Sequence, residues 1–171
     1  MNRKEFKEMI QHDCSRYKIG SHLKTYIMNP GYQITFLFRK CSYYRNNKLL
    51  KPLYYYYRWK YRSKCVKYGC DIPSHVQIGA GLKIDHPFGI VINSQAMIGE
   101  NFNIKSGAVI GKNDKGVPRI GNNVTIGVNA VVIGNLTIED DSIIGAGAIV
   151  VHNVPKSSVV VCEPAFVKYI R

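Results

Sequence analysis

One short stretch of the chain combines residue types that can carry out proton transfer. It reads Asp85-His86-Pro87-Phe88-Gly89, and a further carboxylate, Asp71, precedes His86 by 15 residues. A carboxylate beside an imidazole fixes its tautomer and stabilises the imidazolium, so that the free nitrogen can take a proton from an alcohol. A hydroxyl activated in this way attacks a thioester without a metal, provided that a donor stabilises the oxyanion. The stretch therefore predicts general-base activation of a hydroxyl.

A six-residue repeat indicates how these residues are positioned. An aliphatic residue returns every six places from residue 120 to residue 150, and residues 72–90 and 92–110 follow the same rule in two registers that differ by two places. A second series of small or apolar residues follows four places after the first. The best-defined series are Ile120, Ile126, Val132, Ile138, Ile144 and Val150, and Val124, Ala130, Leu136, Ser142, Ala148 and Val154.

A period of six fits neither an α-helix, which needs 3.6, nor a simple strand, which needs two. It fits a coil of three short strands, about 18 residues around, with aliphatic side chains stacked inside. Successive coils then pair about 4.8 Å apart as parallel sheet. The sequence therefore predicts a mainly β protein, a parallel β-helix of about four to five coils over residues 71–171.

Two interruptions of the repeat predict irregular corners. The register slips by two between Ile90 and Ile92, and four extra residues lie within segment 112–119. A solenoid accepts insertions only as surface loops, which commonly border a binding groove, although an ordinary solvated loop is the alternative. In this register His86 points outward at a corner, and Asp71 lies just under one coil earlier. We therefore expect the two residues to be neighbours across adjacent coils.

The motif resembles the serine acetyltransferase branch of the hexapeptide-repeat acyltransferases, which are left-handed parallel β-helices. That branch reads Asp-Ile-His-Pro, about ten residues, then Asp-His-x-x-Gly-(Ile/Val)-Val. Here the matching segments are Asp71-Ile72-Pro73 and DHPFGIV, which begins at Asp85. The resemblance covers about residues 70–171. It implies that His86 is the catalytic base, Asp71 its orienting partner and Asp85 a contact to the acceptor. It also implies a left-handed coil and a homotrimer with active sites between neighbouring helices.

The N-terminal part carries a weaker resemblance to the helical region of those enzymes. Gly31-Tyr32 and Arg39 match a Gly-Phe…Tyr-Arg stretch, and Asp13 corresponds to an acidic residue that reaches the acceptor. The N-terminal region is, however, about half the usual length.

The loop departs from the serine enzymes at the residues that hold the amino acid carboxylate. Their Arg-His pair is replaced by Gly116 and Val117, which leaves Arg119 as a substitute. Short, basic relatives resemble enzymes that acetylate sugars of capsular or O-antigen polysaccharides, and a sugar needs no carboxylate clamp. The sequence therefore favours a sugar hydroxyl as acceptor. The alternatives are serine O-acetylation and a non-catalytic β-helix scaffold.

The resemblance also implies that acetyl-CoA lies along the outside of the later coils. The candidate contacts are Gly111, Gly127, Val128, Gly145 and Ala146, with Lys156, or Lys168 and Arg171, at the phosphates. Each glycine is equally well explained as a corner residue. No metal is expected, because His75, His86 and His152 lack the spacing of the zinc ligands in a γ-class carbonic anhydrase.

Charge divides the chain into two parts. Residues 1–70 hold 16 Lys and Arg against 3 Asp and Glu, whereas residues 71–171 hold 8 of each. The basic part predicts helices over residues 3–13, 33–47 and 53–69, with a break at residues 29–31. Its aromatic residues suit a trimer cap, with a membrane surface carrying lipid-linked sugar as the alternative. Nucleic acid is a third option without a recognised motif, and we do not expect it.

Cysteine usage and hydropathy bear on location. The five cysteines lack CxxC spacing, which favours reduced thiols in the cytoplasm. No apolar run approaches the 18 to 20 residues of a membrane span, and the first residues do not resemble a secretory signal. The sequence thus predicts a cytoplasmic protein, with the inner face of the membrane as a variant of that location.

Overall fold

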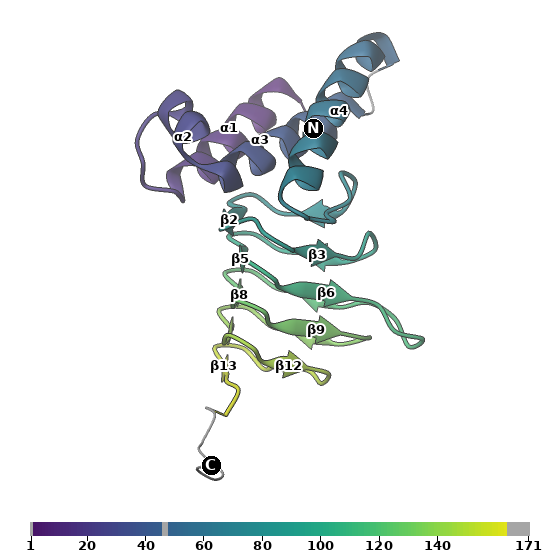
Figure 1. Ribbon diagram of the computed structural model, residues 1–171. Helices are drawn as coiled ribbons and strands as arrows, with labels where there is room; N and C mark the ends of the chain where they lie inside the picture. The colour runs from purple at the N-terminus through teal and green to yellow at the C-terminus, as the bar shows by residue number, and fades with distance from the viewer. Residues whose placement is uncertain (1, 46–47, 164–171) are drawn as a thin grey trace, which may run out of the picture.

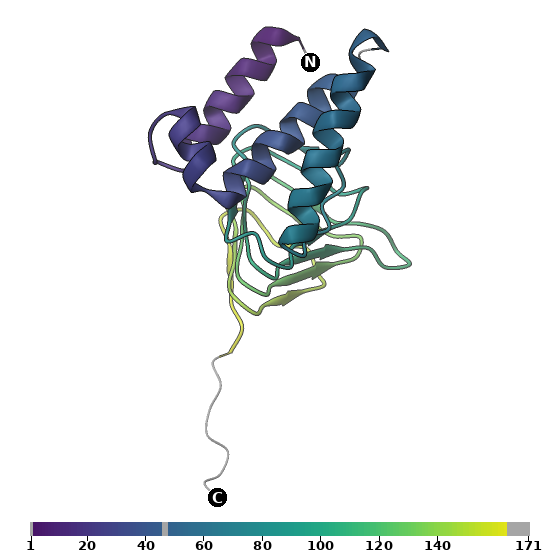
Figure 2. The same cartoon turned by 45° about the horizontal axis from the view of Figure 1, so that its top comes forward.

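The computed structural model describes residues 2–45 and 48–163, in which four helices cap one end of a β-solenoid (Figure 1). Figure 2 shows the same cap from above, with the coils stacked beneath it. The helices are α1 (Arg3–Ser15), α2 (His22–Met28), α3 (Pro30–Arg45) and α4 (Lys51–Lys67), with a 3₁₀ turn at Lys48–Leu50.

Local signals explain where the helices begin. The Asn2 side chain accepts hydrogen bonds from the backbone N–H groups of Lys4 and Glu5, which caps α1. Ser21 caps α2 in the same way, and Pro30 occupies the first position of α3, where its missing N–H costs nothing. Three of the four helices match the predicted segments, whereas the seven-residue α2 was not predicted.

The solenoid has three faces, each a parallel sheet. Face 1 comprises β1 (Gln77–Ile78), β4 (Met97–Ile98), β7 (Arg119–Ile120) and β10 (Thr137–Ile138). Face 2 comprises β2 (Lys83–Asp85), β5 (Asn103–Lys105), β8 (Thr125–Ile126), β11 (Ile143–Ile144) and β13 (Val159–Val160). Face 3 comprises β3 (Val91–Ile92), β6 (Val109–Gly111), β9 (Val131–Ile133) and β12 (Ile149–Val150). The predicted parallel β-helix is confirmed.

The interior is built from the two predicted series of side chains. Ile126, Val132, Ile138 and Ile144 are 0% exposed, and the second series is equally buried, including the hydroxyl-bearing Ser142. Ser142 satisfies its hydroxyl by donating to the carbonyl of Pro155, at 3.0 Å. These residues lie in register across coils and form stacked aliphatic columns, except that Val154 pairs with Ile138 of the first series because the last coil is two residues shorter.

Coil length varies only at the corners. Asp71 pairs with Val91, 20 residues further on, because the corner that contains His86 holds two extra residues. Met97 pairs with Arg119, 22 residues further on, because segment 112–119 projects as a loop between β6 and β7 (Figure 1). Asn113 and Gly116 close that loop with two backbone hydrogen bonds of 3.1 Å. Both predicted interruptions are confirmed.

A buried ion pair joins the helical region to the first coil. The Asp13 carboxylate of α1 accepts two hydrogen bonds from the Arg39 guanidinium of α3, at 2.8 and 3.2 Å. It also accepts from the backbone N–H groups of Gly81 and Leu82, both at 2.8 Å. Arg39 in turn donates to the carbonyls of Ile78 and Gly79. Because neither side chain is more than 2% exposed, every polar atom of the pair depends on these partners.

Several of the aromatic residues in the basic segment have internal roles. The Lys40 ammonium lies 5.0 to 5.7 Å from the centroids of four rings, which come from α1, α3 and α4 (Phe6, Phe36, Tyr44 and Tyr57). Burial lowers the pKa of Lys40. Such cation–π contacts hold the three helices together. Trp59 and Tyr55 of α4 stay exposed, and the trimer-cap and membrane-facing roles remain predictions. Within the described residues no helix is long and apolar enough to cross a bilayer.

The stacked core predicts unequal effects for neighbouring isoleucines of β11. Ile144→Ala empties a fully buried site and should lower the free energy of unfolding by about 2 to 5 kcal/mol. Ile143→Ala, whose side chain is 46% exposed, should cost less than half as much. Chemical denaturation at one fixed protein concentration measures both, and equal losses would contradict the inward assignment.

The clamp between helix and coil predicts a large effect of a small substitution. Asp13→Asn leaves the Arg39 charge buried without its counter-ion, which should cost about 3 to 5 kcal/mol. Asp114→Asn, in the exposed loop, is the matched control and should change stability by less than about 0.5 kcal/mol. Thermal and denaturant unfolding measure the difference. An Asp13→Asn protein as stable as the control would show that the pair is not structural.

Candidate active site

His86 occupies the corner between faces 2 and 3, which we call corner 2–3. β2 ends at Asp85 and β3 begins at Val91, and the chain turns between them through left-handed conformations at His86 (φ 53°) and Gly89 (φ 64°). In later coils the left-handed residues Gly107, Asn129 and Gly147 take the position of Gly89, whereas His86 lies in the enlarged part of the corner. Positive φ is uncommon for any residue other than glycine. An unusual backbone conformation at an exposed imidazole marks His86 as a functional candidate.

Contacts from the connection between α4 and the solenoid hold corner 2–3 in place. The Gly89 N–H donates to the Tyr68 carbonyl at 3.0 Å, and the Cys70 thiol donates to the Pro87 carbonyl at 3.1 Å. The Phe88 ring packs edge-on against Tyr68, with centroids 5.3 Å apart. Positioning of the imidazole therefore depends on the short connection between α4 and the solenoid.

Asp71 lies on the coil next to this corner. Its N–H donates to the Ile90 carbonyl at 2.8 Å, and its carbonyl accepts from Ile92 at 2.9 Å. The carboxylate is exposed at the top of face 3. Asp71 and His86 thus belong to adjacent, hydrogen-bonded coils, as expected. In the described part of the chain, however, no hydrogen bond joins their side chains, so the orienting role of Asp71 stays a prediction.

The predicted acceptor contacts lie in different places. Asp85 is half-buried beside His86 and forms an ion pair of 3.1 Å with Lys83. Asp13 is buried in the clamp with Arg39, and its oxygens are occupied by backbone and guanidinium donors. A direct contact from Asp13 to an acceptor is therefore not supported by this structure. Arg119 is exposed at the start of β7 on face 1, and the fold does not bring it to corner 2–3 of the same chain.

The predicted acetyl-CoA contacts divide among three corners. Gly127, Val128, Gly145 and Ala146 follow β8 and β11 at corner 2–3, on coils beyond His86. Gly111 ends β6 at the corner between faces 3 and 1, where the loop begins. Lys156 lies at the corner between faces 1 and 2, with its ammonium 3.7 Å from Asp141. Lys168 and Arg171 lie outside the described residues.

Packing between coils gives two of these glycines a structural reason. A Cβ at Gly127 would lie 2.7 Å from backbone atoms of the next coil, and one at Gly145 would lie 2.9 Å from the Val160 carbonyl oxygen. Their N–H groups donate to the ladder at 2.8 and 2.7 Å, so neither is free to bind a ligand. Their roles in cofactor binding therefore stay predictions.

Nearby thiols and a phenol are unsuited to act as nucleophiles. Burial raises the pKa of the Cys65 thiol to about 11 and also raises the pKa of Cys70. Burial likewise raises the pKa of the Tyr61 hydroxyl, which donates to the Ile72 carbonyl at 2.7 Å. All three groups stay protonated near neutral pH. The exposed imidazole of His86 is therefore the best placed proton acceptor at this corner.

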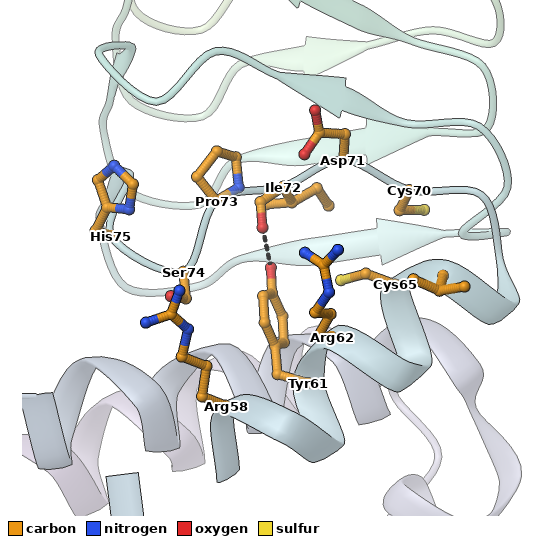
Figure 3. A pocket seen from close by; sticks show the side chains of 11 residues that line it. Arg58, Tyr61, Arg62, Cys65, Cys70, Asp71, Ile72, Pro73, Ser74 and His75 are labelled. Atoms are coloured by element: carbon orange, nitrogen blue, oxygen red, sulfur yellow. Dashed lines mark hydrogen bonds between the residues drawn. The ribbon is translucent and has the colours of Figure 1, made fainter. Parts of the chain in front are cut away.

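A cavity of about 400 Å³ between α4 and the first coil was not predicted from the sequence. Figure 3 shows the Arg58 and Arg62 side chains directed from α4 toward that coil, with Asp71 on the opposite wall. We call this space the α4 cavity. Its lining comprises Arg58, Tyr61, Arg62, Cys65 and Val66 of α4 and residues 70–75. The only available signal was the i, i+4 spacing of the two arginines.

Face 3 presents apolar side chains outward in successive coils. Val91, Val109, Val131 and Ile149 are in register and alternate with buried neighbours, so they point away from the core. Ile149 is 72% exposed and Val151, which follows β12, is 54% exposed. Apolar side chains repeated along one exposed face are typical of an interface.

Comparisons with known proteins agree with this description. A family model described as "Bacterial transferase hexapeptide (six repeats)" matches residues 118–152. The putative colanic acid biosynthesis acetyltransferase WcaB of Escherichia coli K12 is 34% identical over 139 residues, which cover 77% of this chain and 84% of that protein. The serine acetyltransferase of Staphylococcus xylosus is 40% identical over 103 residues, which cover 58% of this chain and 48% of that enzyme.

Solved structures extend the likeness to the helical cap. Serine acetyltransferase isoform 3 of Entamoeba histolytica, in complex with cysteine, superposes with a TM-score of 0.79 at 25% identity, over 98% of this chain and 61% of that one. The Neisseria gonorrhoeae serine acetyltransferase gives 0.77 at 27% identity, over 96% and 66%. The chain thus spans about half to two thirds of these three serine enzymes. The fold, the repeat and the similarity to WcaB show that this protein belongs to the hexapeptide-repeat acetyltransferase family.

Proposed function

We propose that this protein is an acetyl-CoA-dependent O-acetyltransferase that acts on a sugar hydroxyl. The observation that carries the proposal is an exposed histidine held at positive φ, at a corner that continues into a strip of small residues. Acetyl-CoA supplies an acetyl thioester, which an activated hydroxyl attacks without help from a metal. The relatives that share the fold and the repeat are acetyltransferases.

His86 acts first as a base and then as an acid in the proposed reaction. It accepts the proton of the acceptor hydroxyl while that oxygen bonds to the thioester carbonyl carbon. When the carbon–sulfur bond breaks, the imidazolium returns the proton to the leaving thiolate, so His86 ends neutral. Asp71 stabilises the imidazolium from the adjacent coil, and Asp85 orients the acceptor. We expect substrate binding to bring the Asp71 carboxylate within hydrogen-bonding distance of His86, because catalytic hydrogen bonds often form or tighten only in the substrate complex.

Two observations favour a sugar over serine as the acceptor: the loop lacks carboxylate-binding residues, and the chain is similar to WcaB over most of its length. Gly116 and Val117 offer no charged group for an amino acid carboxylate. The similarity to WcaB extends over most of that protein, whereas the chain spans only 48% of the Staphylococcus serine enzyme. Serine remains the alternative acceptor, supported by the structural likeness of the whole chain to serine acetyltransferases.

We also propose that the active protein is a homotrimer packed through face 3. In a threefold arrangement about that face, corner 2–3 of one copy lies beside the loop-bearing corner of the next. His86, Gly127, Val128, Gly145 and Ala146 of one copy then meet Gly111 and segment 112–119 of its neighbour. The groove between two copies thus gathers residues that one chain keeps apart. Lys156 stays outside this groove, which argues against a contact to the cofactor phosphates.

The catalytic role of His86 can be tested by removing the imidazole. His86→Ala should lower CoA release from acetyl-CoA and a polysaccharide-derived sugar by about 10² to 10⁴-fold, the usual contribution of a general base. His12→Ala, which changes a histidine of α1 outside the proposed groove, should leave the rate unchanged. Serine tested in parallel separates the two acceptor classes. Full activity of His86→Ala would refute the proposed mechanism.

The proposed assembly predicts that one charge on face 3 is enough to break it. Light scattering should give the wild type about three times the chain mass of 19.4 kDa. Ile149→Lys should dissociate the trimer and abolish CoA release. Val159→Lys, which changes a side chain 65% exposed on face 2, should leave the mass unchanged. A fully active wild-type monomer would contradict the shared groove.

A further inference from the structure

The two arginines that line the α4 cavity have almost no partners of their own. Within the described residues the Arg62 guanidinium makes no hydrogen bond or ion pair, and Arg58 donates only a long one of 3.4 Å to Tyr54 Oη. One helical turn separates them, so both side chains leave the same side of α4 (Figure 3). Their donors are therefore available to a ligand.

The charges around the cavity favour an anion. The sequence of α4 contains no Asp or Glu, and across the cavity the facing titratable groups are Asp71 and His75. The Asp71 carboxylate forms no ion pair with either arginine among the described residues, so two guanidinium groups face one carboxylate. Tyr61, Cys65 and Cys70 stay neutral because burial raises their pKa values. The balance of charge in the cavity is positive.

The cavity adjoins the proposed catalytic corner. Cys70, on its wall, donates its thiol hydrogen to the carbonyl of Pro87, which follows His86. Asp71, also on the wall, is hydrogen-bonded to Ile90 at the end of the same corner. The cavity wall thus shares Cys70 and Asp71 with the connection that holds the His86 corner. Guanidinium groups bind carboxylate and phosphate in the same forked geometry.

We infer that the α4 cavity binds an anionic group of the acceptor, so that the substrate is an acidic or phosphorylated saccharide and not a neutral one. This inference rests on the proposed acetyltransferase function and names its substrate class. Arg58 and Arg62 supply forked donors for this anionic group. The bound anion orients the sugar, and a neighbouring hydroxyl is presented to His86. Both arginines are positioning residues in this scheme, since neither touches the reacting atoms.

Matched sugar probes test the inference. Methyl β-D-glucuronide carries a carboxylate, glucose 1-phosphate carries a phosphate, and methyl β-D-glucoside has the same ring without charge. Isothermal titration calorimetry should show the wild-type protein binding at least one charged probe about tenfold more tightly than the glucoside. The preferred probe distinguishes a uronic acid from a sugar phosphate. Equal binding of all three probes would overturn the inference.

Substitutions in α4 test whether Arg58 and Arg62 bind the charged probe. Arg58→Gln and Arg62→Gln should each weaken binding of the preferred charged probe about five- to tenfold and leave the glucoside unchanged. Arg62→Lys should retain part of the preference, because charge persists without the fork. Lys60→Gln, which removes a charge from α4 outside the cavity lining, should have no effect. Unchanged charged-probe binding in the Arg58→Gln/Arg62→Gln double variant would also overturn the inference.

Turnover measurements distinguish a failure of this inference from a failure of the proposed function. In CoA-release assays the arginine variants should raise KM for the charged acceptor with little change in kcat. His86→Ala should keep charged-probe binding and lose turnover. Arginine-dependent binding in a wild-type protein that releases no CoA with any sugar would refute the function and support the cavity. Turnover of neutral and charged sugars with equal KM would refute the cavity alone.

Discussion

Pairing between coils is the interaction on which the rest of the structure depends. Each strand has only two or three residues, which is too short to be stable alone. Stability comes from backbone hydrogen bonds to the coils on either side and from inward columns such as Ile104, Ile126 and Ile144. A residue inserted within a strand would move every later side chain out of its column. Extra residues are therefore confined to corners, and the corners carry the candidate chemistry.

The two enlarged corners show how this constraint shapes the candidate site. The two extra residues near His86 free the chain to present an imidazole that ladder pairing would otherwise fix in place. The four extra residues in segment 112–119 build a loop that projects beyond the solenoid. Faces 1 and 2 and the buried columns serve as a scaffold. A regular core thus supports irregular corners whose positions it determines.

Much of the solenoid could be predicted because its information is local and periodic. The six-residue spacing identified the inward residues Ile120 to Val150, which are buried, and the slips at Ile90 and segment 112–119. The Asp85-His86 motif placed the imidazole at an exposed corner for the same reason.

The helical cap could not be predicted in the same way because its contacts are long-range. Asp13 meets Arg39 and Gly81 only in the folded chain, so nothing nearby in sequence revealed a structural role. The α4 cavity depends on the docking of a helix and could not be seen either.

Contacts between the helical cap and the solenoid position the His86 corner. The Asp13–Arg39 pair and the contacts of Tyr68 and Cys70 fix α4 and the first coil against the His86 corner.

The most direct test of the proposed active site is a crystal structure of the protein with bound CoA. We expect the CoA sulfur at corner 2–3, within hydrogen-bonding reach of His86, with segment 112–119 of a neighbouring copy closing the groove. CoA bound at another corner, with His86 remote from the sulfur, would contradict the central claim.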